Sequence, residues 1–118
     1  ETAATARQKG EYMGFFHFLG GPDINREVET CRETPGGLLV DVRTPEEYRQ
    51  GHIPGSVNLP LGEIGQVDRI GAQADTPLFL YCRSGARSGQ ASALLRRMGY
   101  RSVHNIGGIA AYRGKVER

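Results

Sequence analysis

The chain has 118 residues, with 15 Lys plus Arg against 13 Asp plus Glu, 17 Gly, 2 Cys and no Trp. A chain of this length folds as one domain that buries roughly two-thirds of its unfolded surface, so it needs no disulfide scaffold. Cys31 and Cys82 belong to no CxxC pair and to no Cys/His cluster, so we expect no structural metal. No apolar run approaches the roughly 20 residues that span a bilayer, and the start does not resemble a signal peptide, so we expect a soluble, cytoplasmic protein.

The net charge of +2 conceals an uneven distribution. Residues 1–81 include 7 basic and 12 acidic residues, whereas residues 82–118 include 8 basic residues and 1 acidic residue. Thirteen of the fifteen basic residues are Arg, whose planar guanidinium suits phosphate, sulfonate and carboxylate groups. The basic final third is compatible with an anionic substrate, with a nucleic acid or with a solvated helix face.

Residues 1–12 are small and polar, show no periodicity and precede Met13. We expect them to be a tag remnant or a disordered arm, and we expect residues 13–118 to form a single domain. Residues 15–19 form a short apolar patch that is followed by Gly20. We expect this patch to be a short edge strand or to pack on a face of the domain.

The first predicted helix begins after Asp23, which can cap it. Its apolar positions Ile24, Val28 and Cys31 are four and three residues apart, so they lie on one face. The segment 38–42 is nearly continuous in apolar and β-branched residues, which is typical of a strand covered on both faces of a parallel sheet.

A short helix is predicted directly after this strand. Thr44 is its N-cap, Pro45 its first residue and Glu47 its third, which together make a capping box with an acidic first turn. Gly51 ends the helix, and a loop leads to a short strand at 57–59.

The second half of the chain continues the alternation. One or two helical turns are expected at 64–70, and the apolar segment 77–82 predicts a second buried strand. The helix that follows ends at Gly99. Its apolar stripe consists of Ala91, Leu94, Leu95 and Met98. With a last short strand at 103–106, strands and helices alternate at a spacing that predicts an α/β domain with a mostly parallel sheet.

Cys82 ends the second apolar strand, and in open parallel sheets ligands bind where such strands end. The turn into the next helix is made mostly of small residues and reads Arg83-Ser84-Gly85-Ala86-Arg87-Ser88. The backbone N–H groups of such a turn and the helix N-terminus attract negative charge. With Arg83 and Arg87 nearby, we expect the pKa of Cys82 to lie well below the free value of about 8.5, which makes this residue a nucleophile at neutral pH.

A lone cysteine at a strand end can also be a small buried hydrophobic residue. Against that interpretation, Cys82 is followed within six residues by Gly85, two Arg and two Ser. A purely structural connection has no use for so much positive charge beside a thiol. We therefore favour the functional interpretation.

Four blocks of sequence occur in order along the chain. They read LLVDVR and PEEY within 38–48, GHIPGSVN at 51–58, LYCRSGARS at 80–88 and GGI at 107–109. With these blocks the chain resembles the single-domain rhodaneses, a family of thiosulfate and persulfide sulfurtransferases. The resemblance extends over about residues 23–112.

The resemblance implies a mostly parallel sheet of about four to five strands with helices on both faces. It also implies a cysteine, here Cys82, that takes up a sulfane sulfur as a persulfide and passes it to a nucleophile. The cradle for this sulfur is then the six-residue loop of Cys82, Arg83, Ser84, Gly85, Ala86 and Arg87. Arg83 and Arg87 would orient an anionic donor and stabilise departing sulfite, and the chemistry needs no metal or organic cofactor.

The partners implied by the resemblance are a small anionic sulfur donor and an acceptor. The possible donors are thiosulfate, glutathione persulfide, 3-mercaptopyruvate and a carrier protein, and the Arg-rich loop favours the anionic ones without choosing among them. The acceptor is cyanide or a thiol, such as glutathione, a thioredoxin-like protein or a carrier protein. A membrane partner is not expected, and a nucleic acid is not favoured because no aromatic platform accompanies Arg96, Arg97 and Arg101.

Four further residues invite smaller predictions. Asp41, at the end of the first strong strand, either pairs with an arginine and orients the active loop or caps the following turn; the resemblance suggests the ordering role. Arg43 and His52 lie in segments that should converge on the same edge of the sheet. His52 is a possible base, but GHIPG is a structural turn in this family, which we favour. Cys31 is expected in the core, with a resolving role toward Cys82 as the alternative.

Two other functions remain as alternatives. One is a non-catalytic rhodanese-like module that binds a partner or senses redox state through Cys82. The other is a Cys-dependent phosphatase, which uses a Cys-x5-Arg loop. Here Arg87 follows Cys82 after four residues and Ser88 occupies the position that a phosphatase requires, so dephosphorylation is disfavoured. The family also has a Trp after its Gly-Gly motif where this chain has Tyr112, which bears on the packing of the C-terminal segment and not on the chemistry.

Overall fold

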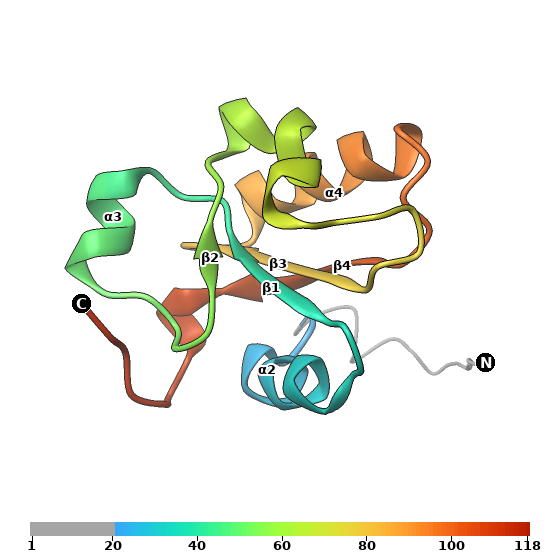
Figure 1. Ribbon diagram of the computed structural model, residues 1–118. Coiled ribbons are helices and arrows are strands. Elements are labelled where there is room, and N and C mark those ends of the chain that lie inside the picture. The colour runs from blue at the N-terminus through green and yellow to red at the C-terminus, as the bar shows by residue number, and fades with distance from the viewer. Residues whose placement is uncertain (1–20) are drawn as a thin grey trace.

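The computed structural model describes residues 21–118, and the predictions for residues 1–12 and 15–19 lie outside the described residues. Its strands are β1 (Leu38–Asp41), β2 (Val57–Asn58), β3 (Leu78–Cys82) and β4 (Val103–Gly108). Its helices are α2 (Ile24–Glu33), α3 (Pro45–Gln50) and α4 (Ala86–Arg97), with 3₁₀ segments η1 (Leu61–Ile70) and η2 (Ile109–Ala111). The four strands form one parallel sheet in the order β2-β1-β3-β4 (Figure 1).

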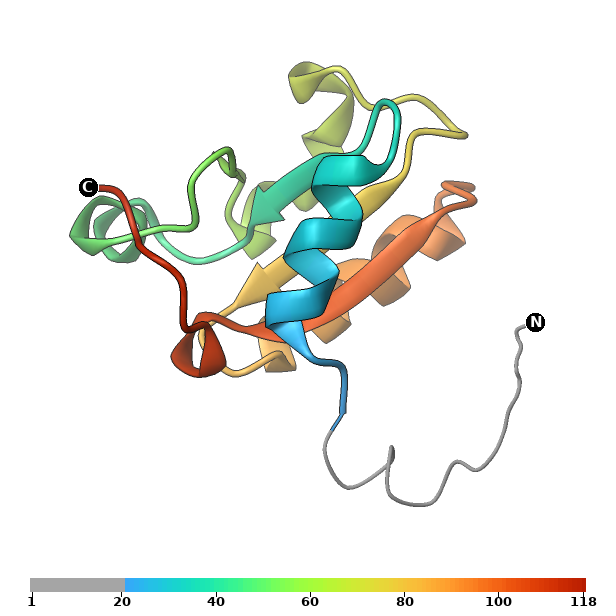
Figure 2. The same cartoon turned by 90° about the horizontal axis from the view of Figure 1, so that it is seen from below.

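Helical segments cover both faces of this sheet. Figure 1 shows η1 and α4 on one face and α2 on the other, and Figure 2 shows α2 lying over the strands from below. The predicted α/β class is confirmed, and the sheet of residues 21–118, expected to be mostly parallel with about four to five strands, is parallel with four. No helix within residues 21–118 is long and apolar enough to cross a membrane.

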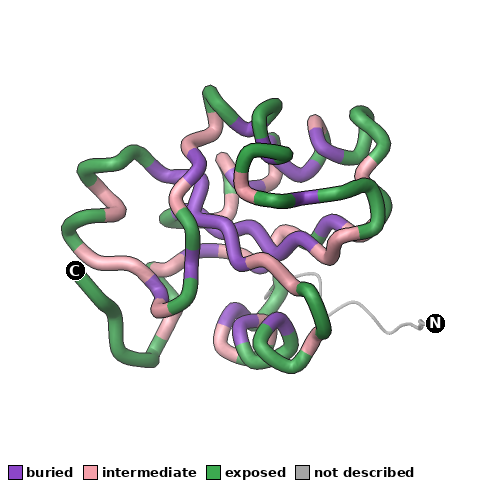
Figure 3. Tube along the Cα trace, in the orientation of Figure 1, coloured by how far each residue is buried: buried purple, intermediate pink, exposed green. Residues whose placement is uncertain are grey.

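The side chains of β3 alternate between the two faces. Leu78 and Leu80 belong with Cys82 to the cluster under α4 and η1. Phe79 and Tyr81 belong to the cluster under α2. All of β3 is buried, and the buried stretches of the chain follow the centre of the sheet (Figure 3). A strand covered on both faces is apolar at successive positions, which is why this segment reads as one continuous apolar run.

The predicted caps set the helix starts. The Asp23 carboxylate accepts the backbone N–H of Asn25 at the start of α2. At the start of α3, Thr44 Oγ1 accepts the Glu47 N–H and the Glu47 carboxylate accepts the Thr44 N–H. This closes the predicted capping box, and Gly51 ends the helix as expected.

The apolar stripe predicted for α4 is wrong at its last position. Ala91 and Leu95 are buried, but Met98 is 45% exposed. Met98 is the C-cap residue and therefore lies beyond the last helical residue. The buried face of α4 extends instead toward its N-terminal end, where it includes Ser88.

Candidate active site

Cys82 lies at the carboxyl end of β3, where the loop into α4 begins. Its side chain belongs to the α4 side of the sheet, and the residue is only 1% exposed. Gly85 caps α4 with φ +103°, in the left-handed region that glycine enters without strain. The N–H of Gly85 donates to Cys82 Sγ at 3.0 Å. The loop therefore places the sulfur beside the N-terminal end of a helix, as the sequence predicts.

The sulfur of Cys82 is surrounded by hydrogen-bond donors. Burial alone would raise the pKa of this thiol, but hydrogen bonds from the Ser88 hydroxyl and from the backbone N–H groups of Ser88, Gly85 and Ser84 outweigh burial. The pKa of Cys82 therefore lies below its ordinary value. The direction and the contribution of the backbone N–H groups agree with the sequence prediction, whereas the hydrogen bond from the Ser88 hydroxyl was not foreseen.

Ser88 and Asn105 were not assigned to the site from the sequence. Ser88 Oγ lies 3.5 Å from Cys82 Sγ and 2.7 Å from Asn105 Oδ1. Asn105 Nδ2 also donates to the Gly85 carbonyl at 3.1 Å, and Asn105 Oδ1 accepts the Gly107 N–H at 3.1 Å. The signal available in the sequence for Asn105 was a polar residue in the last strand, two positions before the Gly-Gly motif.

The Gly-Gly motif at the end of β4 lets this strand pack against the loop. Gly107 has φ +106°, and Gly108 has no room for a Cβ atom because that atom would overlap the carbonyl of Arg83. The backbone N–H of Ala110 donates to the same carbonyl at 3.2 Å. Gly107 is therefore favoured by its left-handed backbone, and Gly108 is required for the close approach of two backbones.

Arg87 pairs with Glu47 of α3. Arg87 Nη1 lies 2.8 Å from Glu47 Oε1 and Arg87 Nη2 lies 3.0 Å from Glu47 Oε2, so the ion pair is bidentate. The hydrogen bond from Arg87 lowers the pKa of Glu47 to about 2. Arg83 is exposed and makes no ion pair within residues 21–118. The two arginines predicted to orient a donor therefore differ, because Glu47 neutralises the charge of Arg87. From the sequence, Glu47 was identified only as a helix-capping residue.

Asp41 both pairs with an arginine and caps a turn. Its carboxylate accepts Arg43 Nη2 at 2.7 Å and Nε at 3.1 Å, and both residues are buried. The backbone N–H of Arg43 donates to the same carboxylate at 2.9 Å. Arg43 Nη2 also donates to the Gly51 carbonyl at 2.7 Å. The buried pair therefore fixes the turn after β1 and joins it to the loop before β2, and the partner of Asp41 is Arg43 instead of an arginine of the active loop.

His52 belongs to the structural turn after Gly51. Its Nδ1 lies 2.8 Å from the Tyr48 carbonyl oxygen, and its ring stacks on Tyr48 with the centroids 3.7 Å apart. Its backbone pairs with Glu117 in both directions at 2.8 Å. These contacts favour the structural interpretation of His52 over a role as a base.

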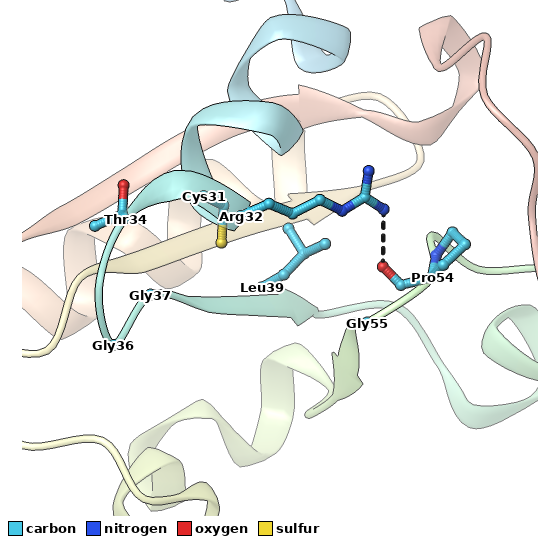
Figure 4. Close-up of a pocket in the computed structure, with 8 residues that line it drawn as sticks. All are labelled: Cys31, Arg32, Thr34, Gly36, Gly37, Leu39, Pro54 and Gly55. Carbon is cyan, nitrogen blue, oxygen red and sulfur yellow. Dashed lines mark hydrogen bonds between the residues drawn. The ribbon is translucent and has the colours of Figure 1, made fainter.

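Cys31 lies on the opposite side of the sheet from Cys82. It is 5% exposed in the cluster under α2, and burial raises the pKa of its thiol to about 11. Cys31 lines a hollow of about 170 Å³. The Arg32 guanidinium, which also lines it, donates to the Pro54 carbonyl with an N–O distance of 3.1 Å (Figure 4). The core interpretation of Cys31 is confirmed, and both thiols are free.

The chemistry available to this site is that of a buried cysteine whose thiolate form is stabilised by hydrogen-bond donors. A thiolate is the nucleophilic form of cysteine. The N–H groups that stabilise it also stabilise negative charge on a group attached to it. The exposed guanidinium of Arg83 on the same loop suits an anionic reactant.

Residues 25–115 match the family model of the rhodanese-like domain. The chain is 42% identical over 72 residues to the thiosulfate sulfurtransferase PspE of Escherichia coli (strain K12). This aligned region covers 59% of this chain and 68% of PspE. It is 39% identical over 80 residues to the protein YqhL of Bacillus subtilis (strain 168). That aligned region covers 67% of this chain and 63% of YqhL, which is slightly less than two thirds of that relative. The solved structure of a rhodanese with anions from E. coli is similar with a TM-score of 0.64 and 34% identity, over 69% of this chain and 96% of that one. The chain is therefore a member of the rhodanese-like domain family.

Proposed function

We propose that this chain is a sulfurtransferase that carries a sulfane sulfur on Cys82. The observation that carries the proposal is the environment of Cys82 Sγ, which accepts the Gly85 N–H at 3.0 Å and lies 3.5 Å from the Ser88 hydroxyl. These donors hold the pKa of the thiol below its ordinary value, although the residue is buried. A thiolate in a loop of N–H groups suits both attack on sulfur and retention of a persulfide.

The reaction consists of two displacements at sulfur. The Cys82 thiolate attacks the outer sulfur of thiosulfate or of a persulfide, forming a new S–S bond while the donor's S–S bond breaks. The electron pair leaves with sulfite or with the donor thiolate. A second nucleophile, a thiolate or cyanide, then attacks the outer sulfur of the Cys82 persulfide. Cys82 departs as the thiolate, and the acceptor leaves as a persulfide or as thiocyanate.

The loop provides the binding groups for this chemistry. We assign the substrate-binding loop to Arg83, Ser84, Gly85, Ala86 and Arg87. Arg83 offers an exposed guanidinium to an anionic donor, whereas the positive charge of Arg87 is neutralised by its ion pair with Glu47. Asp41 and Arg43 support the site by fixing the turn at the neighbouring end of β1.

The proposed acceptors are thiols, such as glutathione, a thioredoxin-like protein or a sulfur-carrier protein. The similarity to PspE, which is named a thiosulfate sulfurtransferase, supports thiosulfate as a donor. The alternative is a non-catalytic rhodanese-like module that binds a partner or senses redox state through the same cysteine. The two functions differ in whether sulfur leaves the protein.

A measurement of catalytic turnover distinguishes the sulfurtransferase from the non-catalytic module. With thiosulfate as donor, we expect the wild-type protein to form thiocyanate from cyanide and a persulfide from glutathione at rates proportional to protein concentration. We expect Cys82→Ser to abolish both products and Cys31→Ser, the matched control at the other cysteine, to retain them. Thiosulfate, glutathione persulfide and 3-mercaptopyruvate compared at equal concentration would rank the donors. Wild-type protein that yields no product with any of them would refute the sulfurtransferase and favour the module.

A further inference from the structure

The Ser88 hydroxyl has one hydrogen and two acceptors within reach. Its Oγ lies 2.7 Å from Asn105 Oδ1 and 3.5 Å from Cys82 Sγ. A hydroxyl group has a single donor hydrogen, so Ser88 cannot donate to both acceptors at once. The short oxygen–oxygen distance is typical of a well-formed hydrogen bond to Asn105, whereas a negative charge on the sulfur draws the hydrogen toward Cys82.

The orientation of the Asn105 amide is fixed by its two other partners. Nδ2 donates to the Gly85 carbonyl and Oδ1 accepts the Gly107 N–H, both at 3.1 Å. A flipped amide would place Nδ2 against the Gly107 N–H and Oδ1 against the Gly85 carbonyl, which are two repulsive contacts. Asn105 therefore presents an acceptor, and never a donor, to Ser88.

The place of Asn105 depends on an irregularity in the sheet. Leu80 lies opposite Asn105, but Tyr81 lies opposite Gly107, so Ile106 is the extra residue of a β-bulge. A bulge interrupts the regular hydrogen bonding between strands, and the Asn105 side chain takes up the Gly107 N–H. The bulge therefore gives Asn105 a partner on β4 that stays in place whichever way the Ser88 hydrogen points.

We propose that Asn105 is a positioning residue for the Cys82 thiolate, because its amide oxygen competes with the sulfur for the hydrogen of Ser88. While Cys82 is a thiol, the Ser88 hydroxyl donates its hydrogen bond to Asn105 Oδ1. When Cys82 is a thiolate, the hydroxyl turns and donates to the sulfur instead, and Asn105 Oδ1 still accepts the Gly107 N–H. Once a sulfane sulfur is attached, the negative charge lies on the outer sulfur, and the Ser88 hydroxyl again donates to Asn105. This last step rests on the proposed sulfur transfer, whereas the competition between Asn105 and the thiolate does not.

Within residues 21–118, no charged side chain forms a hydrogen bond with the side chain of Ser88 or Asn105. The charged side chains that the loop, α4, α3 and the end of β1 bring to this region are Arg83, Arg87, Glu47, Asp41 and Arg43. Within residues 21–118, the side chains of Ser88 and Asn105 form hydrogen bonds with each other, with Cys82 and with the backbone of Gly85 and Gly107. Substitutions at Ser88 and Asn105 therefore leave every one of these charges in place.

A double-mutant cycle read out by the pH dependence of Cys82 alkylation tests the proposal. The rate of iodoacetamide labelling is followed on the Cys82 peptide in the wild type, in each single variant and in the double variant. We expect Ser88→Ala to raise the midpoint by about one pH unit, because the thiolate loses a donor. We expect Asn105→Ala to lower it by roughly half a pH unit, because the hydroxyl is released to the sulfur. In the Ser88→Ala background, Asn105→Ala leaves the midpoint unchanged, because Asn105 acts only through that hydroxyl.

Two further variants control for packing. Asn105→Leu fills a similar volume without an acceptor and is expected to reproduce the shift of Asn105→Ala. Ser88→Thr retains a hydroxyl, and in that background Asn105→Ala again lowers the midpoint. A midpoint that rises in both Asn105 variants, or a shift of equal size with and without the Ser88 hydroxyl, would overturn the proposal. Alkylation uses no sulfur donor, so this failure is distinct from a failure of sulfur transfer.

Discussion

Glu47 and Arg87 form a two-bonded ion pair that joins α3 to the first turn of α4 across 40 residues of sequence. The Glu47 carboxylate also accepts the backbone N–H of Thr44 and so closes the N-terminal cap of α3. One side chain therefore links a local helix cap to the loop that holds Cys82. The pair also lowers the positive charge that Arg87 offers to an anionic donor.

Removal of the Glu47 charge is expected to strengthen donor binding. In Glu47→Gln, Arg87 is no longer neutralised, so we expect the KM for thiosulfate to fall by about two- to fivefold at low salt, with the difference shrinking as salt screens the charge. Steady-state kinetics at several ionic strengths measures this. Glu46→Gln, an exposed neighbour in the same helical turn, is the matched control and should leave KM unchanged. An unchanged or increased KM in Glu47→Gln would contradict the role given to the pair.

The same pair predicts a pH dependence of stability. The hydrogen bond from Arg87 lowers the pKa of Glu47 from 4.5 to about 2, so the ionised carboxylate is favoured in the folded state. Its stabilisation is complete above the unfolded value and is lost as the pH falls toward the folded one. We expect the difference in unfolding free energy between wild type and Glu47→Gln, under about 1 kcal/mol because the pair is partly exposed, to vanish over that range. Urea unfolding at a series of pH values measures it, and a difference that grows on acidification contradicts the assignment.

The two cysteines are expected to differ sharply in reactivity. The pKa of Cys82 lies below the ordinary thiol value, whereas burial raises that of Cys31 to about 11. Near neutral pH, we expect iodoacetamide to label Cys82 in the native protein and Cys31 only after unfolding. Peptide mapping by mass spectrometry identifies the labelled residue. Equal labelling of both thiols in the native protein would disagree with the structure.

Gly108 is expected to tolerate no side chain. A Cβ atom at this position would overlap the carbonyl of Arg83 and displace the active loop. We expect Gly108→Ala to lower the unfolding free energy by about 1–3 kcal/mol and to reduce sulfur transfer more than stability alone explains. Gly65→Ala is the control, because a Cβ atom there meets open space in η1. Equal activity in the two folded variants would show that the close approach at Gly108 is not needed.

The buried pair of Asp41 and Arg43 is expected to be costly to break. Asp41→Asn keeps the shape of the side chain but leaves the Arg43 guanidinium buried without its counter-charge. We expect a loss of about 3 kcal/mol in unfolding free energy. Asp68→Asn, at an exposed carboxylate, should change it by less than about 0.5 kcal/mol. A similar small effect at Asp41 would remove the argument that this pair fixes the turn after β1.

Features that depend on neighbouring residues could be predicted from the sequence. The capping box of Thr44 and Glu47 is formed within four residues, and the burial of β3 follows from its continuous apolar run. The same holds for the turn from Cys82 to Gly85, where a strand end, small residues and a helix start follow one another. Within residues 21–118, the end of the α4 stripe was wrong, because Met98 lies past the point at which the helix stops, and the last strand runs two residues further than predicted.

Features that depend on distant residues could not be predicted in this way. The carboxylate of Glu47 had a complete local role as a cap, so nothing in the sequence pointed to its bond with Arg87. Asn105 lies 17 residues from Ser88, and its approach depends on a β-bulge that no local pattern announced. The sequence therefore pointed to Cys82 and its turn, whereas Ser88 and Asn105 were recognised only from the packed structure.

The proposed sulfur transfer requires that Cys82 accepts a sulfane sulfur and holds it as a persulfide. The most direct test is the intact mass of the protein after incubation with thiosulfate and removal of excess donor. The wild type and Cys31→Ser should each gain the mass of one sulfur atom, this gain should disappear on addition of cyanide, and Cys82→Ser should gain nothing. A wild-type mass that does not change, or a gain that persists in Cys82→Ser, would contradict the claim.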